Sequence, residues 1–260
     1  MPLRKLEPSF RERPWGTRHL EPWFPNARAT AGPSPIGEVW FETPEVPLLV
    51  KFLFAQENLS VQVHPDDKYA RFHHNSPGKT EMWHVLKAEP GAKIAAGFRE
   101  PVTSEQARAG ALDGSIMSML EWFDAQPGDT FFIPAGTVHA IGAGLTICEI
   151  QQQSDITYRF FDYGRGRELH LDSALAVSNL CSHDARRAEQ VECDYFVTQP
   201  LKVEGALTLP ASGHMLLIAI EGEGEIDGQP MRAGEVFCAE DLSYMKLTGN
   251  LRLLRTSVGV

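Results

Sequence analysis

The sequence Gly128-Asp129-Thr130-Phe131-Phe132-Ile133-Pro134-Ala135-Gly136-Thr137-Val138-His139 contains a turn, a short apolar strand, a second turn and a histidine. Residues 130–133 are β-branched and aromatic, which suits a half-buried pleated surface. Pro134 has no N–H to donate and ends the strand, and Gly136 gives the backbone freedom for a tight reversal. His139 therefore arrives on the next strand, where a rigid backbone would hold a metal ligand in place.

The spacing of this stretch resembles the second metal-binding motif of the cupin family. Glycine, five residues, proline, one residue, glycine, two residues and histidine follow one another from position 128 to position 139. The resemblance implies a jelly-roll β-sandwich in which an earlier pair of strands supplies the other ligands. We therefore expect an all-β-dominated protein with a few short helices.

The earlier ligands are expected on a strand over residues 59–64 and just after it. Gln62 and His64 lie two residues apart there, so both side chains face the same side of the strand. With Glu81 and His139 they offer oxygen and imidazole donors, which suit Zn²⁺, Mn²⁺ or Fe²⁺ better than a soft metal. The alternative is that the two histidines are ordinary, partly buried side chains.

Several further blocks resemble type I mannose-6-phosphate isomerases, in the order in which that family carries them. The blocks are residues 59–67, residues 78–83 and residues 151–159, with weaker matches at Trp15-Gly16, residues 37–40 and residues 167–170. The likeness covers roughly residues 10 to 180, and the chain is similar to the compact bacterial branch. It implies a metal-dependent aldose–ketose isomerase that interconverts mannose 6-phosphate and fructose 6-phosphate through an enediolate.

The resemblance also implies roles for individual residues. It implies one Zn²⁺ per chain, with four ligands: Gln62, His64, Glu81 and His139. It implies three catalytic residues, which are Arg159 beside the reacting carbons, Glu149 and Lys79. The identity of the general base stays open at this point.

The phosphate group of the substrate would be bound by Lys51, Ser60 and Arg165, again by resemblance. Arg165 departs from the lysine expected at that position, but arginine also binds phosphate, in a bidentate manner. Lys51 interrupts the apolar run of residues 48–54, where an unpaired ammonium would be costly to bury. The alternative for all three residues is a solvated surface.

Composition limits the partners. The chain has 260 residues and a formal net charge of −10 at pH 7, which argues against nucleic-acid binding because that needs a basic patch. An anionic sugar phosphate needs only a few local cations, and such a small molecule is the expected partner. The sequence indicates no particular oligomeric state.

The four cysteines, Cys148, Cys181, Cys193 and Cys238, are scattered without Cys-x-x-Cys spacing. A disulfide framework is not expected in so long a chain, so free thiols in a reducing cytoplasm are predicted. The N-terminus lacks the apolar segment of a signal peptide, and no apolar run approaches the ~20 residues of a membrane span. We expect a cytoplasmic protein that does not bind membranes.

A change to charged residues without strand pattern near residues 181–193 marks the expected domain boundary. Residues 1–185 are predicted to form the catalytic cupin domain with the metal site. Residues 190–260 alternate short apolar runs with turns, which predicts a smaller cupin-like β domain without metal motifs. Its lone histidine, His214, is expected to be structural.

Helices are expected over residues 65–72, from Thr103 or Ser104 to about residue 111, and over residues 169–179. Acidic residues in the first turn and capping side chains support the first two. The mixed segment over residues 115–123 has no decisive pattern.

Two other functions fit a cupin metal site. An Fe²⁺ cupin dioxygenase would use two histidines and one carboxylate, but that arrangement has no need of Gln62. A non-catalytic sugar-phosphate-binding cupin would keep the pocket without turnover. The presence of Arg159, Glu149 and Lys79 argues against the second.

Overall fold

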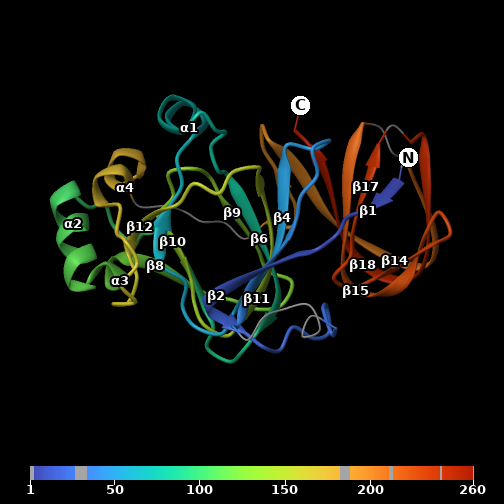
Figure 1. The fold of residues 1–260 in the computed structure, drawn as a ribbon, viewed down its shortest axis with the longest axis horizontal. Coiled ribbons are helices and arrows are strands. Elements are labelled where there is room, and N and C mark those ends of the chain that lie inside the picture. Colours follow the sequence, from blue (N-terminus) through green and yellow to red (C-terminus); the bar gives the residue numbers. More distant parts are fainter. Residues whose placement is uncertain (1–2, 27–33, 182–187, 211–212, 241, 260) are drawn as a thin grey trace. The chain divides into compact units, whose positions relative to one another are not determined.

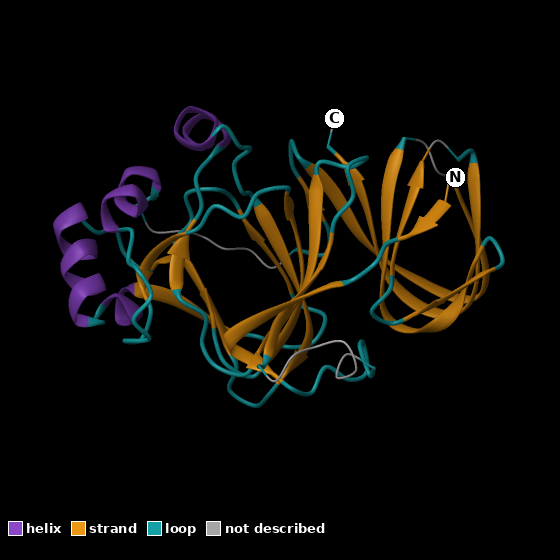
Figure 2. Cartoon of the chain, in the orientation of Figure 1, coloured by secondary structure: helices purple, strands orange, loops and turns teal. Residues whose placement is uncertain are grey.

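The computed structural model describes residues 3–26, 34–181, 188–210, 213–240 and 242–259. Antiparallel strands dominate, and the helices are short (Figure 2). This confirms the predicted all-β-dominated, cupin-like architecture. The chain forms two compact units, Met1–Phe52 with Glu189–Val260 and Leu53–Ala188.

The unit of residues 53–188 is built from two antiparallel sheets. One has five strands in the order β12-β5-β10-β7-β8. Its strands are β5 (Val61–Val63), β7 (Lys93–Phe98), β8 (Leu120–Asp124), β10 (His139–Ile141) and β12 (Tyr158–Phe161). The other contributes three strands in the order β11-β6-β9, which are β6 (Glu81–Ala88), β9 (Thr130–Ile133) and β11 (Leu145–Gln152).

The stretch around Pro134 forms the predicted strand, turn and strand. Strand β9 ends at Ile133, directly before the proline. Gly136 has a φ of 86°, a left-handed conformation that glycine adopts without strain. The N–H of Gly136 donates to the carbonyl of His64 at 2.8 Å. The turn therefore brings the two histidine-bearing segments together before any side chain is considered.

The three predicted helices are present. Helix α1 (Asp67–His74) begins after Asp66, whose carboxylate accepts from the N–H of Tyr69. Helix α2 (Ser104–Asp113) begins after Thr103 with a capping box to Gln106. Helix α4 (Leu171–Val177) lies within the predicted range, and the untyped segment over residues 115–123 divides into α3 (Ile116–Met119) and β8.

Helices α2, α3 and α4 lie together beside the sheet that carries β8, β10 and β12 (Figure 1). Ala107, Ile116 and Ala174 from these helices share one hydrophobic cluster with Val61 and Val63 of β5. Because alternate residues of a strand point to opposite faces, this packing turns the residue between the two valines to the inner face. The positions of Val61 and Val63 thus decide that Gln62, a predicted metal ligand, lies on the inner face of β5.

The other unit is dominated by one antiparallel sheet in the order β1-β17-β15-β18-β14-β13, with β16 paired to β15. Its strands are β1 (Leu3–Lys5), β13 (Val191–Glu192), β14 (Phe196–Pro210), β15 (His214–Ile226), β16 (Gln229–Arg232), β17 (Val236–Glu240) and β18 (Tyr244–Val258). Strands β2 (Ser9–Thr17) and β3 (Ile36–Phe41) pair with each other, and β4 (Leu48–Ala55) runs from this unit into the other.

The N-terminal segment is tied to the C-terminal sheet. Strand β1 adds to β17 with Leu3 opposite Ala239, and the indole N–H of Trp23 donates to the carbonyl of Ile220 at 2.8 Å. Strand β1 therefore belongs to the C-terminal sheet, and residues 1–52 fall in one compact unit with residues 189–260. The assignment of catalysis to residues 1–185 stays a prediction.

None of the helices in the described part of the chain combines the length and apolar character that a membrane crossing requires. All four cysteines are free thiols, as expected. Burial, with the negative charge of Glu149 nearby, raises the pKa of the Cys148 thiol. This thiol therefore stays protonated and unreactive.

His84 makes the stability of the chain depend on pH. The ring is buried, with Nδ1 2.9 Å from the Thr130 hydroxyl, and burial lowers its pKa from 6.5 to about 4 while Asp129 opposes the shift. Between these values the unfolded chain binds a proton that the folded chain does not. The stability contribution is therefore complete above pH 6.5 and is lost as the pH falls toward about 4.

We predict that His84→Gln removes this dependence. The loss of unfolding free energy between about pH 7.5 and about pH 5 should shrink by about 2 kcal/mol, measured by denaturant titration. The exposed His73, replaced in the same way, is the control. An unchanged difference in His84→Gln would contradict the assignment.

Candidate metal centre and active site

The five-stranded sheet brings three predicted site residues into one row. His139, the first residue of β10, lies opposite Gln62 on β5, and Gln62 lies opposite Arg159 on β12. Directly opposed residues on neighbouring strands point to the same face. Since Gln62 faces inward, His139 and Arg159 face inward with it.

The other sheet presents a carboxylate pair and a tryptophan. Trp83 on β6 lies opposite Glu149 on β11, and Glu81 stands two residues before Trp83 on the same face. The indole N–H of Trp83 donates to Oε2 of Glu149 at 2.9 Å. This hydrogen bond holds the buried Glu149 carboxylate in one orientation between the sheets.

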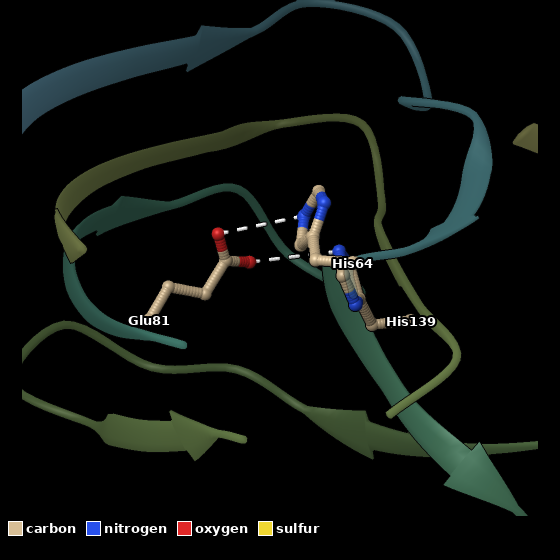
Figure 3. Close-up of side chains that lie close together, drawn as sticks. All are labelled: His64, Glu81 and His139. Atoms are coloured by element: carbon tan, nitrogen blue, oxygen red, sulfur yellow. Dashed lines mark ion pairs between the residues drawn. The ribbon is translucent and has the colours of Figure 1, made fainter. Parts of the chain in front are cut away.

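His64, Glu81 and His139 meet between the sheets (Figure 3). Their candidate ligand atoms lie within 4.8 Å of one another. Nε2 of His64 is 3.6 Å from Oε2 of Glu81, and Nε2 of His139 is 3.5 Å from Oε1 of the same carboxylate. All three side chains are at most 2% exposed. A buried carboxylate between two imidazoles is the arrangement of a metal centre.

Both histidines are oriented by backbone carbonyls. Nδ1 of His64 lies 2.8 Å from the carbonyl of Ile156, and Nδ1 of His139 lies 2.9 Å from the carbonyl of Thr137. A carbonyl only accepts, so each Nδ1 carries the proton and each Nε2 presents a lone pair to the cluster. Burial first, and then the charge of Lys79, lowers the pKa of His139 to about 3. The neutral ring is the form that binds a metal.

The His64, Glu81 and His139 donor set fits a divalent ion, and the predicted fourth ligand, Gln62, lies next to it. The Gln62 amide lies 3.3 Å from Nε2 of His139 through its nitrogen, while its oxygen accepts from the Ser60 hydroxyl at 3.1 Å. Half a turn of this amide would bring its oxygen to the cluster. The Ser60 hydroxyl would then accept a hydrogen bond from the amide nitrogen. Two imidazoles, one carboxylate and one amide oxygen are ligands suited to Zn²⁺.

Lys79 already places positive charge at this cluster. Its ammonium lies 2.9 Å from Nε2 of His64, contacts Oε2 of Glu81 and lies 3.8 Å from Oε1 of Glu149. Lys79 is 4% exposed, so the ammonium and both carboxylates interact in a poorly screened interior. The cluster therefore already contains one cationic group, and Lys79 lies between the predicted metal ligands and the predicted catalytic residue Glu149.

Arg159 is anchored beside His170. Its backbone N–H contacts Nδ1 of His170 at 3.1 Å, and the backbone N–H of His170 donates to the Arg159 carbonyl at 2.9 Å. Burial first, and then the charge of Arg159, lowers the pKa of His170. His170 is thereby kept neutral beside a fixed guanidinium-bearing residue.

Two of the predicted phosphate ligands lie at one end of the β5–β12 pair. Ser60 directly precedes β5, and Val61 lies opposite Phe161 at the end of β12, after which the chain leads to Arg165. Arg165 is held by Asp162, with Nη2 2.9 Å from Oδ1. Ser60 points to the same face as Gln62, so this end adjoins the metal cluster.

Lys51 belongs to the other compact unit. It is 5% exposed, and its ammonium lies 4.6 Å from the ring centroid of Trp40, within cation–π range. The side chain is thus neither at a solvated surface nor in a purely apolar environment. Its role toward phosphate stays a prediction.

Sequence reasoning assigned no role to Trp83, Asp67 or Gln152. Trp83 holds Glu149, and Gln152 joins Asp67 to the segment before Glu81. The signal available in the sequence was a run of three glutamines at the end of an apolar strand. The middle glutamine, Gln152, is important because it is buried, and burial is decided by the fold.

Two antiparallel sheets with a His–Glu–His cluster between them define a cupin-like protein with a candidate metal centre. A family model described as phosphomannose isomerase type I, catalytic domain, matches residues 36–81. The chain is 38% identical over 228 residues to mannose-6-phosphate isomerase ManA of Bacillus subtilis (strain 168), covering 78% of this chain and 72% of that protein. It is 32% identical over 273 residues to the probable mannose-6-phosphate isomerase GmuF of the same organism, covering 85% and 86%.

The fold agrees with these relatives. The crystal structure of the mannose 6-phosphate isomerase from Bacillus subtilis matches with a TM-score of 0.87 and 25% identity, covering 99% of this chain and 100% of that chain. A putative mannosephosphate isomerase from Archaeoglobus fulgidus matches in fold with a TM-score of 0.82. The chain belongs to the type I phosphomannose isomerase family, which confirms the family predicted from sequence.

We predict that His64→Ala or His139→Ala removes most bound metal. Each substitution deletes one of the converging nitrogen donors from a site whose ligands are preset. Metal per chain should be measured after dialysis against Zn²⁺ and removal of unbound ion. His214→Ala, in the other unit, should keep the wild-type content, and full occupancy in both cluster variants would refute the ligand assignment.

Proposed function

We propose that this chain is a zinc-dependent isomerase that interconverts mannose 6-phosphate and fructose 6-phosphate through an enediolate of the sugar. The observation that carries the proposal is the buried convergence of His64, Glu81 and His139 with Lys79 and Glu149 in a family named for this reaction. The substrate is taken from the names of the relatives. The metal is inferred from the donor set.

The reaction moves a proton between two adjacent carbons while the neighbouring oxygen gains negative charge. Bound Zn²⁺ would act as a Lewis acid beside that oxygen and, having no redox chemistry, suits a reaction without net oxidation. Gln62, His64, Glu81 and His139 would hold it. The remaining requirements are a proton carrier, a group that stabilises the enediolate and a phosphate anchor.

The proton carrier is assigned to the Lys79–Glu149 pair. The two charged groups lie 3.8 Å apart and are both buried, so their protonation states depend on each other. The hydrogen bond from Trp83 holds the Glu149 carboxylate in one orientation, which limits the positions with which this carboxylate can exchange a proton. Proton transfer at this pair is more effective because the surrounding protein excludes water.

Arg159 is proposed to stabilise the enediolate. Its place in the row with Gln62 and His139 puts its side chain on the face that carries the metal ligands. A guanidinium on that face would supply donors where negative charge develops. This role differs from phosphate binding, because it acts mainly on the transition state.

The phosphate is proposed to lie at the end of the β5–β12 pair, bound by Ser60 and Arg165. Ser60, Gln62 and His64 alternate along the chain, so the same line of side chains leads from the phosphate end to the metal ligands. Such a line of side chains would bind the phosphate of the sugar at one end, and the other end of the sugar would then lie at the ion. A binding group remote from the reacting carbons can thus orient them.

The proposal is tested by conversion of mannose 6-phosphate to fructose 6-phosphate with purified protein. Activity should disappear after treatment with a chelator and return on addition of Zn²⁺. Absence of turnover in zinc-loaded protein would reject the catalytic proposal. Iron content with oxygen uptake would instead indicate dioxygen chemistry.

We predict that Arg159→Ala and Arg159→Lys lower kcat and kcat/KM together by about 100- to 1000-fold, because one donor to the developing charge is lost. Lysine keeps the charge but lacks the planar donor fork, so it should not rescue. Bound zinc should stay at the wild-type level in both variants. A normal kcat with only a raised KM would move Arg159 from catalysis to binding.

We predict that Arg165→Ala mainly raises KM, by about 10- to 100-fold, since a charged hydrogen bond to phosphate acts equally in both states. Unphosphorylated mannose should be a very poor substrate, and the same substitution should leave its kcat/KM unchanged. Arg108→Ala on the exposed face of α2 is the control. Equal loss with mannose and mannose 6-phosphate would place Arg165 outside the phosphate site.

A further inference from the structure

Three hydrogen bonds join Gln152, buried at the end of β11, to Thr80 and Asp67. Its Oε1 accepts from the backbone N–H of Thr80 at 2.9 Å, and its Nε2 donates to Oδ1 of Asp67 at 2.8 Å. Its own backbone N–H donates to the Thr80 carbonyl at 3.1 Å. The side chain is 5% exposed, so these bonds are protected from competition with water.

Asp67 links this amide to the segment that precedes Glu81. The same Oδ1 that accepts from Gln152 accepts from the N–H of Gly78 at 2.8 Å. A Cβ at Gly78 would lie 2.5 Å from the backbone of Asp66 and Asp67, which shows how closely the two segments approach. Asp67 begins α1 three residues after His64, so the link joins both ligand-bearing parts of the chain.

Residues 78–80 contact every segment that supplies a converging ligand. The N–H of Lys79 donates to the carbonyl of Pro65 at 3.0 Å, next to His64. The hydroxyl of Thr80 accepts from the N–H of Ala135 at 3.2 Å, in the turn that leads to His139. Gln152 is the one buried side chain, among the described residues, that bonds both to this segment and to α1.

We propose that Gln152 is a positioning residue of the metal centre, which with Asp67 fixes residues 78–80 so that Lys79 and Glu81 meet His64. This inference rests on the proposed metal-binding function. Gln152 contacts neither the converging ligand atoms nor the predicted substrate groups, so it acts through the backbone that it holds.

Strand pairing alone does not fix this segment. The ladder between β6 and β11 ends at Glu81 opposite Gln151, and β6 begins at Glu81. The preceding residues have left the strand, so their place depends on bonds to other segments, and the Gln152 amide and Asp67 supply the side-chain bonds among them to Thr80 and Gly78. A ligand or catalytic group displaced by ~1 Å loses much of its effect, which is why such supporting bonds matter.

The test compares Gln152→Met with Gln153→Met, its exposed neighbour, as a matched control. The Zn²⁺ dissociation constant should be measured by competition with a chromophoric chelator, alongside the melting temperature of the metal-free protein. We expect about 10- to 100-fold weaker zinc binding in Gln152→Met and wild-type binding in the control. At saturating zinc, kcat should fall with little change in KM, because Lys79 is displaced.

An exchange of hydrogen-bond donor and acceptor between positions 67 and 152 distinguishes a positioning role of Gln152 from a general contribution to folding. Gln152→Glu brings a second carboxylate against Asp67 and removes the donor. The double variant Asp67→Asn/Gln152→Glu restores the donor–acceptor pair between the two side chains in the opposite sense, while the N–H of Gly78 loses its acceptor, so it should recover part of the zinc affinity lost in the single variant. Recovery of the melting temperature without recovery of affinity would show that Gln152 only stabilises the fold.

The outcomes distinguish this inference from the proposed function. Wild-type protein that binds no zinc would reject the metal centre itself. Wild-type protein that binds zinc, with unchanged affinity in Gln152→Met, would reject the positioning role and leave the centre intact.

Discussion

The fully buried carboxylate of Glu81 is the constraint on which the rest of the site depends. A carboxylate removed from water is stable only beside positive charge and hydrogen-bond donors. Lys79 contacts it, and two imidazole nitrogens face it at 3.5 and 3.6 Å. The same low-dielectric pocket that makes Glu81 costly to bury strengthens its attraction for a cation. Burial therefore makes Glu81 the centre of a candidate metal site.

The surrounding fold supplies rigidity to this arrangement. Backbone carbonyls of Ile156 and Thr137 set the tautomers of the two histidines, and Trp83 sets Glu149. The contacts of His64 with Ile156 and of Trp83 with Glu149 join segments far apart in the sequence, whereas that of His139 with Thr137 is local. A cluster of neutral imidazoles and fixed carboxylates is prepared before an ion or a sugar arrives, so neither has to reorganise the protein. The fold thus fixes the orientations of these side chains.

Pattern reasoning performs well where local geometry determines the outcome. Period-two spacing placed Gln62 and His64 on one side of a strand, and the turn at Pro134 and Gly136 delivered His139 to the next strand as predicted. It did not anticipate that β1 adds to β17, because pairing between strands so far apart in the chain leaves no local signature. Nor did it identify Gln152, whose partners Thr80 and Asp67 lie far from it in the chain.

The sequence by itself determined the strand-rich architecture, the family and the ligand types, because alternation, turn residues and motif spacing are local and survive without coordinates. The tertiary structure decided which of these residues share a pocket. It set Lys79 between Glu81 and Glu149, oriented both imidazoles, and made Gln152 and Asp67 part of the site. The physical reason is that burial and cross-strand register are properties of non-local contacts, and the chemistry of a charged group depends on its burial.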